Sequence, residues 1–267
     1  MKAPSFAYAK PRALAEALAL AARPAARILA GGQSLIPSLN LRLSSPELLV
    51  DINGLPELKG IRFDNGVVRI GALATHAEIG KSDVVNEHLP LLAEAVPHIA
   101  HPAIRNRGTL GGSLALADPA AEYPACVLAL DATIVAEGSK GSRKIRASDF
   151  FKGLFETDLE DGELLTAVEF NAQKKDEKSA FLELARRHGD YAIVGLAAFA
   201  SSGTKRLAYF GAADRAVLAP HAAKAKDLDS AKAALAKDLQ PPADLYHTSQ
   251  TKLHLARVLL ERAWTRL

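Results

Sequence analysis

The sequence predicts an α+β protein, in which short strands alternate with helices and a final sheet is followed by helices. Short apolar runs that end at Gly, Asn or Asp are typical of strands, and Ala/Leu-rich segments between them are typical of helices. Near the C-terminus, three strand-like runs precede a helical stretch, which is an α+β pattern. The 267 residues are 49% hydrophobic and 24% charged, as in ordinary globular proteins.

The N-terminal part predicts a helix, two strands and a loop between them. A helix is expected over residues 11–22, because Pro11 suits the first helical position and Ala and Leu follow. The apolar run 26–29 predicts a strand that leads into a glycine loop. A helical turn over 35–39 and a strand over 48–52 come next. The glycine loop is therefore expected at a strand end.

A hairpin gives the clearest local signal in the middle of the chain. Residues 61–63 and 67–70 flank Asp64-Asn65-Gly66, a turn sequence that tolerates left-handed conformations. Thr75 and Glu78 have the spacing of a capping box, which predicts the start of a helix. The remaining elements expected here are a helix over 89–99 and strands over 133–136 and 144–146.

The last third of the chain predicts a separate unit. Residues 171–179 form a polar, lysine-rich connector, which suggests a domain boundary. Helices are expected from residue 219 onward, after strands near 181–187, 193–201 and 206–211. The final helix, around 252–264, carries an apolar stripe that predicts packing rather than function: Leu253, Ala256, Leu259 or Leu260, and Ala263.

Charge and cysteine content exclude several classes of protein. The net charge is +3, and the densest basic run, Lys174-Lys175, is neutralised by Asp176-Glu177, so no nucleic-acid-binding face is expected. Cys126 is the only cysteine, which leaves no disulfide pair and no cysteine cluster for zinc or iron–sulfur. The N-terminus has no apolar signal core and no apolar stretch is long enough for a membrane span, so a cytoplasmic protein is expected.

Two short glycine loops carry the strongest functional signal: Ala30-Gly31-Gly32-Gln33-Ser34 and Thr109-Leu110-Gly111-Gly112-Ser113. Glycine lets the backbone approach an anion closely, and a neighbouring hydroxyl adds a donor. Either glycine pair alone is more often an ordinary turn. Together they predict a two-part cradle for a pyrophosphate. Around the second loop, the small and polar residues of 101–124 predict either a ligand-contact loop or a plain surface loop.

Two other kinds of site are disfavoured. No Gly-x-Gly-x-x-Gly follows the first strand, and no acidic residue lies at the ribose distance, so a Rossmann dinucleotide fold is not expected. His98 and His101 are three residues apart, but Pro102 follows and no third ligand is evident. We expect no metal site in this chain.

The order and spacing of five segments resemble a known family: Ala30–Ile36, Asp51-Ile52, Ile70-Gly71-Ala72, Arg105–Ser113 and Gly189-Asp190-Tyr191-Ala192. Over essentially its whole length the chain is similar to the medium, FAD-binding subunits of molybdenum hydroxylases, such as carbon monoxide dehydrogenase, and to the flavin domain of xanthine dehydrogenase. The resemblance implies a two-lobed FAD-binding domain of the vanillyl-alcohol-oxidase (PCMH) type and a small α+β C-terminal domain with a three-stranded sheet plus helices. The implied boundaries are 1–57 for lobe 1, 58–173 for lobe 2 and 174–267 for the C-terminal domain.

The resemblance also implies which residues contact FAD. The first loop would hold the pyrophosphate and nearby ribityl oxygens through its backbone, over Leu29, Ala30, Gly31, Gly32, Gln33, Ser34, Leu35 and Ile36. The second loop would add amides and hydroxyls from Thr109, Gly111, Gly112 and Ser113. Glu122 would accept hydrogen bonds from FAD hydroxyls, Ile99 and Leu164 would line the apolar surface of flavin or adenine, and Tyr191 would shield one face of the isoalloxazine.

Two positions depart from the family pattern. Ser113 stands where relatives often have Asn, which keeps a donor on a shorter side chain. Thr251-Lys252 stands where relatives often have a Tyr-Arg pair, so a bidentate arginine contact to a partner is not expected there. Neither change replaces a glycine of the two loops.

The implied function is electron transfer within a complex. A large molybdopterin subunit would oxidise substrate, a small subunit would carry two [2Fe–2S] clusters, and this chain would pass electrons through FAD to NAD, oxygen or a quinone. The resemblance implies a dimer of such heterotrimers. In this chain no residue would be catalytic and none would bind metal.

Two alternatives stay open at the level of sequence. A stand-alone FAD-dependent oxidase or reductase of the same fold, similar to the UDP-sugar enolpyruvyl reductases, would need a proton donor beside the flavin, for which Ser113 is the candidate. A non-enzymatic flavin-binding scaffold would need no such donor. If the isolated chain catalyses a reduction, the stand-alone oxidase or reductase is favoured. If the reaction depends on an iron–sulfur partner, the electron-transfer function is favoured.

Overall fold

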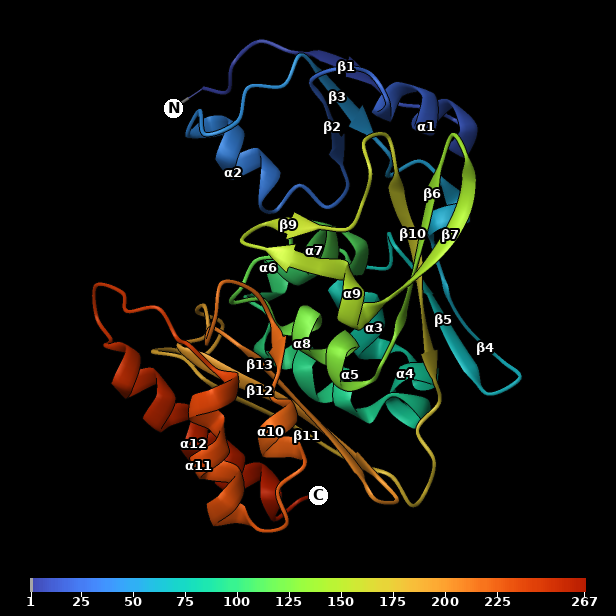
Figure 1. Cartoon of the computed structure of the whole chain (residues 1–267). Coiled ribbons are helices and arrows are strands. Elements are labelled where there is room, and N and C mark those ends of the chain that lie inside the picture. Colours follow the sequence, from blue (N-terminus) through green and yellow to red (C-terminus); the bar gives the residue numbers. More distant parts are fainter. Residues whose placement is uncertain (1) are drawn as a thin grey trace.

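Three short parallel strands form the sheet of the N-terminal lobe, in the order β1 (Ala7–Ala9), β3 (Leu48–Asp51) and β2 (Ala26–Leu29). The computed structural model describes residues 2–267 (Figure 1). Leu29 pairs with Asp51, so the chain leaves β2 and β3 at the same edge of the sheet. The other elements of this lobe are α1 (Leu14–Ala21), α2 (Leu35–Asn40) and the 3-10 turn η1 (Pro56–Leu58).

A five-stranded antiparallel sheet forms the second lobe, in the order β4 (Ile61–Asp64), β5 (Val67–Gly71), β10 (Leu164–Asn171), β6 (Thr133–Gly138) and β7 (Gly141–Arg146). The chain between β5 and β6 is helical, and its apolar side chains form the largest core cluster together with this sheet. These helices are α3 (His76–Lys81), α4 (Asp83–His88), α5 (Pro90–Ala95), the 3-10 turn η2 (Val96–His98), α6 (Pro102–Arg105), α7 (Leu110–Leu116) and α8 (Glu122–Ala129). After β7 come α9 (Ala147–Phe150) and a hairpin of β8 (Phe151–Gly153) and β9 (Glu156–Thr157).

A second antiparallel sheet joins the second lobe to the C-terminal helices, in the order β11 (Lys178–Leu184), β12 (Val194–Ser201), β13 (Thr204–Phe210) and β14 (Val217–Leu218). One face packs on α5 and α8, and the other on α10 (Pro220–Ala223) and α12 (Ser249–Trp264), against which α11 (Leu228–Asp238) packs (Figure 1). Alternate residues therefore enter different cores. Tyr209 packs with the C-terminal helices and Phe210 with the second lobe.

Several local predictions are confirmed. The hairpin forms at Asp64-Asn65-Gly66, between β4 and β5. The capping box is complete, because Thr75 Oγ1 accepts from the Glu78 amide at 3.2 Å and the Glu78 carboxylate accepts from the Thr75 amide at 2.7 Å. The stripe of the last helix packs as expected, with Ala256, Leu259, Leu260 and Ala263 fully buried.

Other local predictions are corrected by the structure. The stretch 101–124 is mainly helical, because the glycine pair allows α7 to begin against the backbone of Ala72. The helix expected over 89–99 is α5 followed by a 3-10 turn, since Pro97 has no amide hydrogen to continue an α-helix. The C-terminal sheet has a fourth strand, the two-residue β14, which is too short to give a sequence pattern.

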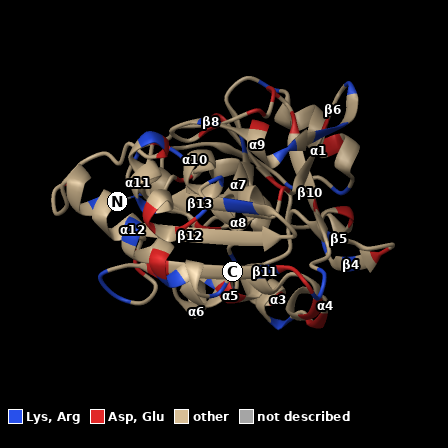
Figure 2. Ribbon diagram, turned by 60° about the horizontal axis from the view of Figure 1, so that its bottom comes forward, with Lys and Arg blue, Asp and Glu red and all other residues tan. Residues whose placement is uncertain are grey.

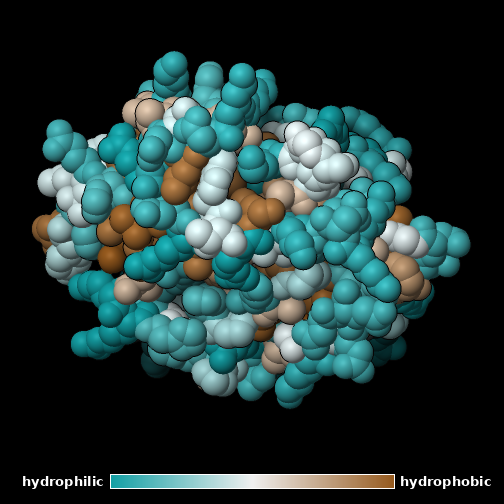
Figure 3. All heavy atoms as spheres, turned by 90° about the horizontal axis from the view of Figure 1, so that it is seen from below, coloured by the Kyte–Doolittle hydropathy of each residue, from teal (hydrophilic) through white to brown (hydrophobic). Residues whose placement is uncertain are grey.

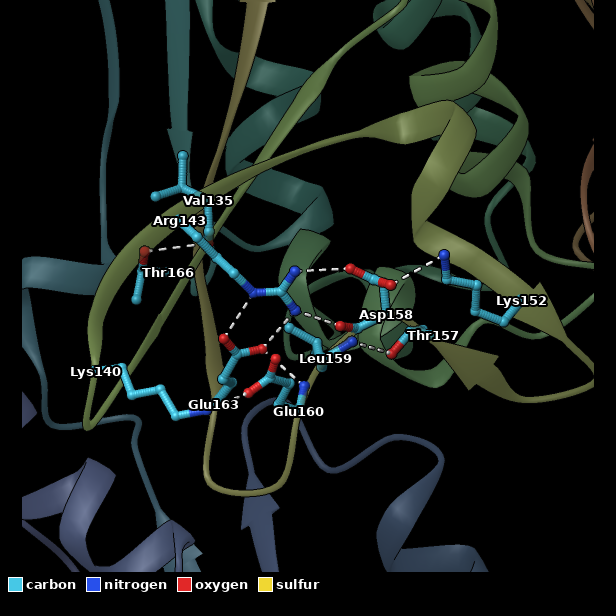
Figure 4. A network of polar contacts seen from close by, with 10 residues as sticks. All are labelled: Val135, Lys140, Arg143, Lys152, Thr157, Asp158, Leu159, Glu160, Glu163 and Thr166. Atoms are coloured by element: carbon cyan, nitrogen blue, oxygen red, sulfur yellow. Dashed lines mark hydrogen bonds and ion pairs between the residues drawn. The ribbon is translucent and has the colours of Figure 1, made fainter.

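Arg143 connects the β6–β7 hairpin to the segment that leads into β10 (Figure 4). Its guanidinium donates from Nε to Glu163 at 2.8 Å and from Nη1 to Asp158 at 2.7 Å, and it also contacts the Asp158 carbonyl. Lys152 pairs with the same Asp158 at 2.9 Å. The two carboxylates raise the pKa of Arg143 above its usual range. This network holds 158–163 close to Ala22 at the end of α1, beside which Gly162 lies.

The charged residues of both signs are interspersed along the chain (Figure 2). The face seen from below is mostly hydrophilic, with separate small apolar areas (Figure 3). Across residues 2–267, no helix combines the length and the apolar character needed to cross a bilayer.

Candidate functional site

The first glycine loop leaves β2 and carries unpaired amide groups into α2. Gly32 has a φ of +73°, a conformation that favours glycine and turns successive amides to one side. Within residues 2–267, the amides of Gly31, Gly32, Gln33 and Ser34 donate to no protein acceptor. Gln33 Nε2 donates to the Gly31 carbonyl at 3.0 Å, which orients the peptide before the turn. Consecutive free amides of this kind form an anion-binding concavity.

Residues at the end of β3 hold the first loop in place. Asn53 Nδ2 donates to the Ala30 carbonyl at 2.8 Å and to Asp51 Oδ1 at 2.7 Å. Tyr8 donates its hydroxyl to Asp51 Oδ2 at 2.5 Å. Burial opposes ionisation of Asp51, but the hydrogen bonds from Tyr8 and Asn53 outweigh it and hold the pKa of this carboxyl below its usual range. Asp51 therefore helps to position the first loop indirectly, because it holds the Asn53 side chain that donates to the Ala30 carbonyl.

The second glycine loop is the first turn of α7. Thr109 is the N-cap residue, and its Oγ1 accepts from the Gly112 amide at 3.1 Å. The amides of Leu110, Gly111 and Ser113 donate to Ala74, Ala72 and Thr109 carbonyls. These amides are therefore engaged within the chain, and the Thr109 and Ser113 hydroxyls are the donors that this loop still offers to a ligand.

The two loops are in direct contact. A Cβ on Gly31 would lie 2.2 Å from the Arg107 carbonyl oxygen and 2.8 Å from Gly108 Cα. A Cβ on Gly112 would lie 3.9 Å from Ala30 Cβ. Only a residue without a side chain fits at position 31, because both neighbours are backbone atoms. The structure thus places the two glycine loops next to each other.

A cleft of about 480 Å³ opens along the first loop. Arg107, in the segment before α7, is among its lining residues, and the Arg107 atoms that lie beside Gly31 are those of its carbonyl group. Its guanidinium forms no ion pair within residues 2–267. The cleft is thus lined by free amides and by one positively charged residue, which are groups that a pyrophosphate can use. Its lining residues are Leu29, Ala30, Gly31, Gly32, Gln33, Ile36, Pro37, Asp51, Asn53 and Arg107.

A group of acidic side chains lies beyond the other end of α7. Glu122 opens α8 and is only 9% exposed, and burial raises its pKa to about 7. Burial followed by the charge of Glu122 raises the pKa of Glu183 on β11 to about 8. Burial and the charges of Asp118 and Glu122 raise the pKa of Tyr191, although this residue is 73% exposed.

The two predicted apolar contacts are mostly buried. Ile99 is 7% exposed and ends η2, where its carbonyl accepts from Arg105 Nη1 at 3.0 Å. The next residue, Ala100, lies against Gly189 of the Gly-Asp-Tyr segment. Leu164 is 3% exposed and belongs to the core cluster of the N-terminal lobe, with Ala30 at the edge of that cluster. Ile99 thus lies near the segment Gly189–Tyr191, and Leu164 shares a core cluster with Ala30 of the first loop.

Six of the expected first-loop residues line the cleft, while Ser34 and Leu35 do not. Sequence reasoning missed four residues that line the cleft, Pro37, Asp51, Asn53 and Arg107. The position of Asn53 directly after a strand was a usable signal, because neighbouring parallel strands end at one edge of a sheet.

Lys252, at the departure from the family pattern, is engaged inside the chain. It is 7% exposed, and its Nζ pairs with Asp244 at 2.8 Å. The hydrogen bond from Lys252 and the amides of Tyr246 and His247 hold the pKa of Asp244 well below its usual range. The ion pair between Lys252 and Asp244 therefore connects α12 to the loop that precedes it.

Comparison with known proteins identifies the class. The model of the FAD binding domain in molybdopterin dehydrogenase matches residues 4–171, and the chain belongs to this family. It is an FAD-binding medium subunit of the molybdenum hydroxylase type of oxidoreductase. The family, the α+β fold and FAD as the cofactor, all expected from the sequence, are thereby confirmed.

Individual relatives match over nearly the whole chain. The alpha subunit of the 6-hydroxypseudooxynicotine dehydrogenase complex of Paenarthrobacter nicotinovorans is 39% identical, over 98% of this chain and 94% of the relative. The medium chain of glyceraldehyde dehydrogenase of Sulfolobus acidocaldarius is 36% identical, over 99% of each. A carbon monoxide dehydrogenase structure from Hydrogenophaga pseudoflava superposes with a TM-score of 0.95 at 37% identity, covering 100% of this chain and 98% of that one.

Proposed function

We propose that this chain is the electron-transfer subunit of a molybdenum hydroxylase complex, taking electrons from [2Fe–2S] clusters of a partner and passing them through FAD to an external acceptor. The observation that carries the proposal is the cleft beside the contact between the glycine loops, which is lined by Arg107 and by three residues with free amides, Gly31, Gly32 and Gln33. The family match and the names of the relatives, which are subunits of dehydrogenases, support the same role.

In this proposal, different residues of the chain bind different parts of FAD. The amides of 31–34 and the Arg107 guanidinium bind the pyrophosphate, and the Thr109 and Ser113 hydroxyls add donors. Glu122 accepts hydrogen bonds from FAD hydroxyls, and Tyr191 covers one face of the isoalloxazine. Ile99 and Leu164 supply apolar support. FAD, when bound, supplies the redox chemistry by which electrons that arrive one at a time are passed on in pairs.

Partner subunits supply the remaining redox centres in this proposal. A large subunit holds molybdopterin and oxidises the substrate, and a small subunit holds two [2Fe–2S] clusters. An exposed apolar turn suits a protein contact: Leu154 and Phe155, between β8 and β9, are 60% and 55% exposed. We propose a dimer of heterotrimers in the cytoplasm, with NAD, oxygen or a quinone as acceptor, and the division of this chain at residues 57 and 173.

Reconstitution of the complex tests the electron path. With all three subunits present, substrate is expected to bleach the flavin absorbance near 450 nm. Omission of the small subunit is expected to slow this bleaching by at least about a thousandfold, because electrons then have no iron–sulfur clusters through which to reach the flavin. Dithionite, which reduces flavin directly, serves as the control for an intact cofactor. Substrate turnover by the full complex without any flavin bleaching would contradict the proposal. Reduction of the isolated chain by NADH would instead favour a stand-alone reductase.

A further inference from the structure

Arg105, the last residue of α6, donates to backbone carbonyls at the end of η2. Its Nη1 lies 3.3 Å from the Pro97 carbonyl oxygen, 3.0 Å from that of Ile99 and 2.7 Å from that of Ala100. The last carbonyls of a helix have no partner within it, and a cation beside them is favoured by the helix dipole. The guanidinium forms no ion pair within residues 2–267, so its hydrogen bonds serve this turn, 97–100.

The turn needs such support because Ala100 has a left-handed backbone. Its φ is +44°, a conformation that the Cβ of alanine disfavours. The shortest of the three hydrogen bonds from Arg105 ends on the carbonyl of this residue. His101, the next residue, is the N-cap of α6, and its carbonyl accepts from the Ile104 and Arg105 amides at 2.9 and 3.0 Å. Arg105 therefore closes the turn with both its backbone and its side chain.

The loop between β11 and β12 rests on this turn. A Cβ on Gly189 would lie 2.9 Å from the Ala100 carbonyl oxygen and 3.0 Å from two ring atoms of His101. Gly189 also has a φ of +85°, so glycine is needed both for the conformation and for the close approach. The His188 ring meets the His98 ring edge to face, with centroids 5.6 Å apart. The same carbonyl that accepts from the guanidinium thus lies against the β11–β12 loop.

Local hydrogen bonds give the β11–β12 loop a defined shape. At its base the Ile193 amide donates to the Leu184 carbonyl at 2.8 Å, and near its tip the Asp190 amide donates to the Arg187 carbonyl at 3.1 Å. Tyr191 follows directly and is exposed, so its ring is available to cover a ligand. The place where the loop rests on the second lobe therefore sets the position of this ring.

We infer that Arg105 is a positioning residue for the flavin end of the site: it fixes the turn on which the β11–β12 loop rests, and so places Tyr191 over the isoalloxazine. The inference rests on the proposed function for the role of Tyr191. Arg105 and Arg107 then have separate roles although they are two residues apart. Arg107 lines the cleft at the first glycine loop, whereas Arg105 lies outside that lining and acts through the carbonyl of Ala100.

Amide hydrogen exchange of the FAD-free chain tests the contact between the turn and the loop. Arg105→Met removes the three hydrogen bonds but keeps a long side chain, so the β11–β12 loop is expected to separate from the turn more often. We expect the amides of residues 185–192 to exchange at least about tenfold faster than in the wild type. Arg107→Met is the matched control and is expected to leave this exchange unchanged, because the hydrogen bonds to the turn come from Arg105.

Flavin fluorescence tests the consequence for the cofactor. A tyrosine ring in contact with the isoalloxazine quenches its fluorescence, so bound FAD is expected to fluoresce at least about twofold more strongly in Arg105→Met than in the wild type. Tyr191→Leu removes the ring and sets the level for an uncovered flavin. Arg107→Met is expected to raise the Kd for FAD by at least about tenfold, and Arg105→Met to raise it less, because the groups proposed for the pyrophosphate are unchanged.

Equal exchange of residues 185–192 in Arg105→Met and in the wild type would overturn the inference. So would bound FAD whose fluorescence rises in Tyr191→Leu but not in Arg105→Met. Failure of the wild-type chain to bind FAD would instead reject the proposed function, and unchanged fluorescence in Tyr191→Leu would reject the role proposed for that ring; the exchange experiment decides on Arg105 in both cases. If Arg105→Met does not fold, Arg105→Lys replaces it, and a smaller change in the same direction is expected because lysine keeps the charge without the guanidinium.

Discussion

Replacement of Gly31 by alanine is expected to abolish FAD retention by the purified chain. The new Cβ would lie 2.2 Å from the Arg107 carbonyl oxygen and 2.8 Å from Gly108 Cα, and neither backbone atom can rotate away. The loops would have to separate, which moves the free amides away from Arg107. We expect the Kd for FAD to rise at least about a hundredfold, measured by titration with flavin fluorescence.

Gly54→Ala is the matched control for Gly31→Ala. Gly54 follows Asn53 in the same lobe, but the nearest atom to its Cβ would be Lys10 Cε at 3.4 Å, at the end of a flexible side chain. This variant is expected to bind FAD as the wild type does. A Gly31→Ala chain that folds and binds FAD within about threefold of the wild type would show that the contact between the loops does not define the site.

The second large effect is expected at Gly195, in the centre of the C-terminal sheet. A Cβ there would lie 1.9 Å from Phe210 Cζ, and Phe210 is fully buried and stacked on Phe181 with ring centroids 5.6 Å apart. The ring has no free space to enter, so Gly195→Ala is expected to lower the free energy of unfolding by about 3 kcal/mol or more, at the upper end of overpacking effects. Urea denaturation measures this loss.

A second substitution separates this clash from other effects of alanine on the strand. Phe210→Leu removes most of the ring, so the double variant Gly195→Ala/Phe210→Leu is expected to be more stable than Gly195→Ala alone. The single variant Phe210→Leu completes the double-mutant cycle. Strict additivity of the two losses would show that the Gly195 Cβ and the Phe210 ring do not compete for the same space.

Local sequence signals were sufficient for much of the fold. The Asn65-Gly66 turn and the Thr75/Glu78 box depend on neighbours within the same segment, and both formed as predicted. β1 was missed because three residues give no periodicity, and its pairing with β3 joins residues 41 positions apart, such as Ala7 and Leu48. Helix α7 was missed because glycine has low helix propensity, which tertiary contact with Ala72 overrides here.

In the candidate site, too, features set by local sequence were predicted, and features set by contacts between distant residues were not. The first loop was predicted from its own residues, and it lines the cleft. Arg107 lay within a recognised segment, but its role depends on the contact between the loops, which no local pattern contains. Residues whose roles depend on distant pairing were thus beyond the sequence.

The most direct measurement of the central claim is titration of the chain with FAD and, in parallel, with FMN. FMN carries the flavin but lacks the pyrophosphate and the adenosine, so a site built on the free amides of 31–34 and Arg107 distinguishes the two ligands. We expect one FAD per chain and at least about a hundredfold weaker binding of FMN. Equal affinity for FAD and FMN would contradict the pyrophosphate cradle.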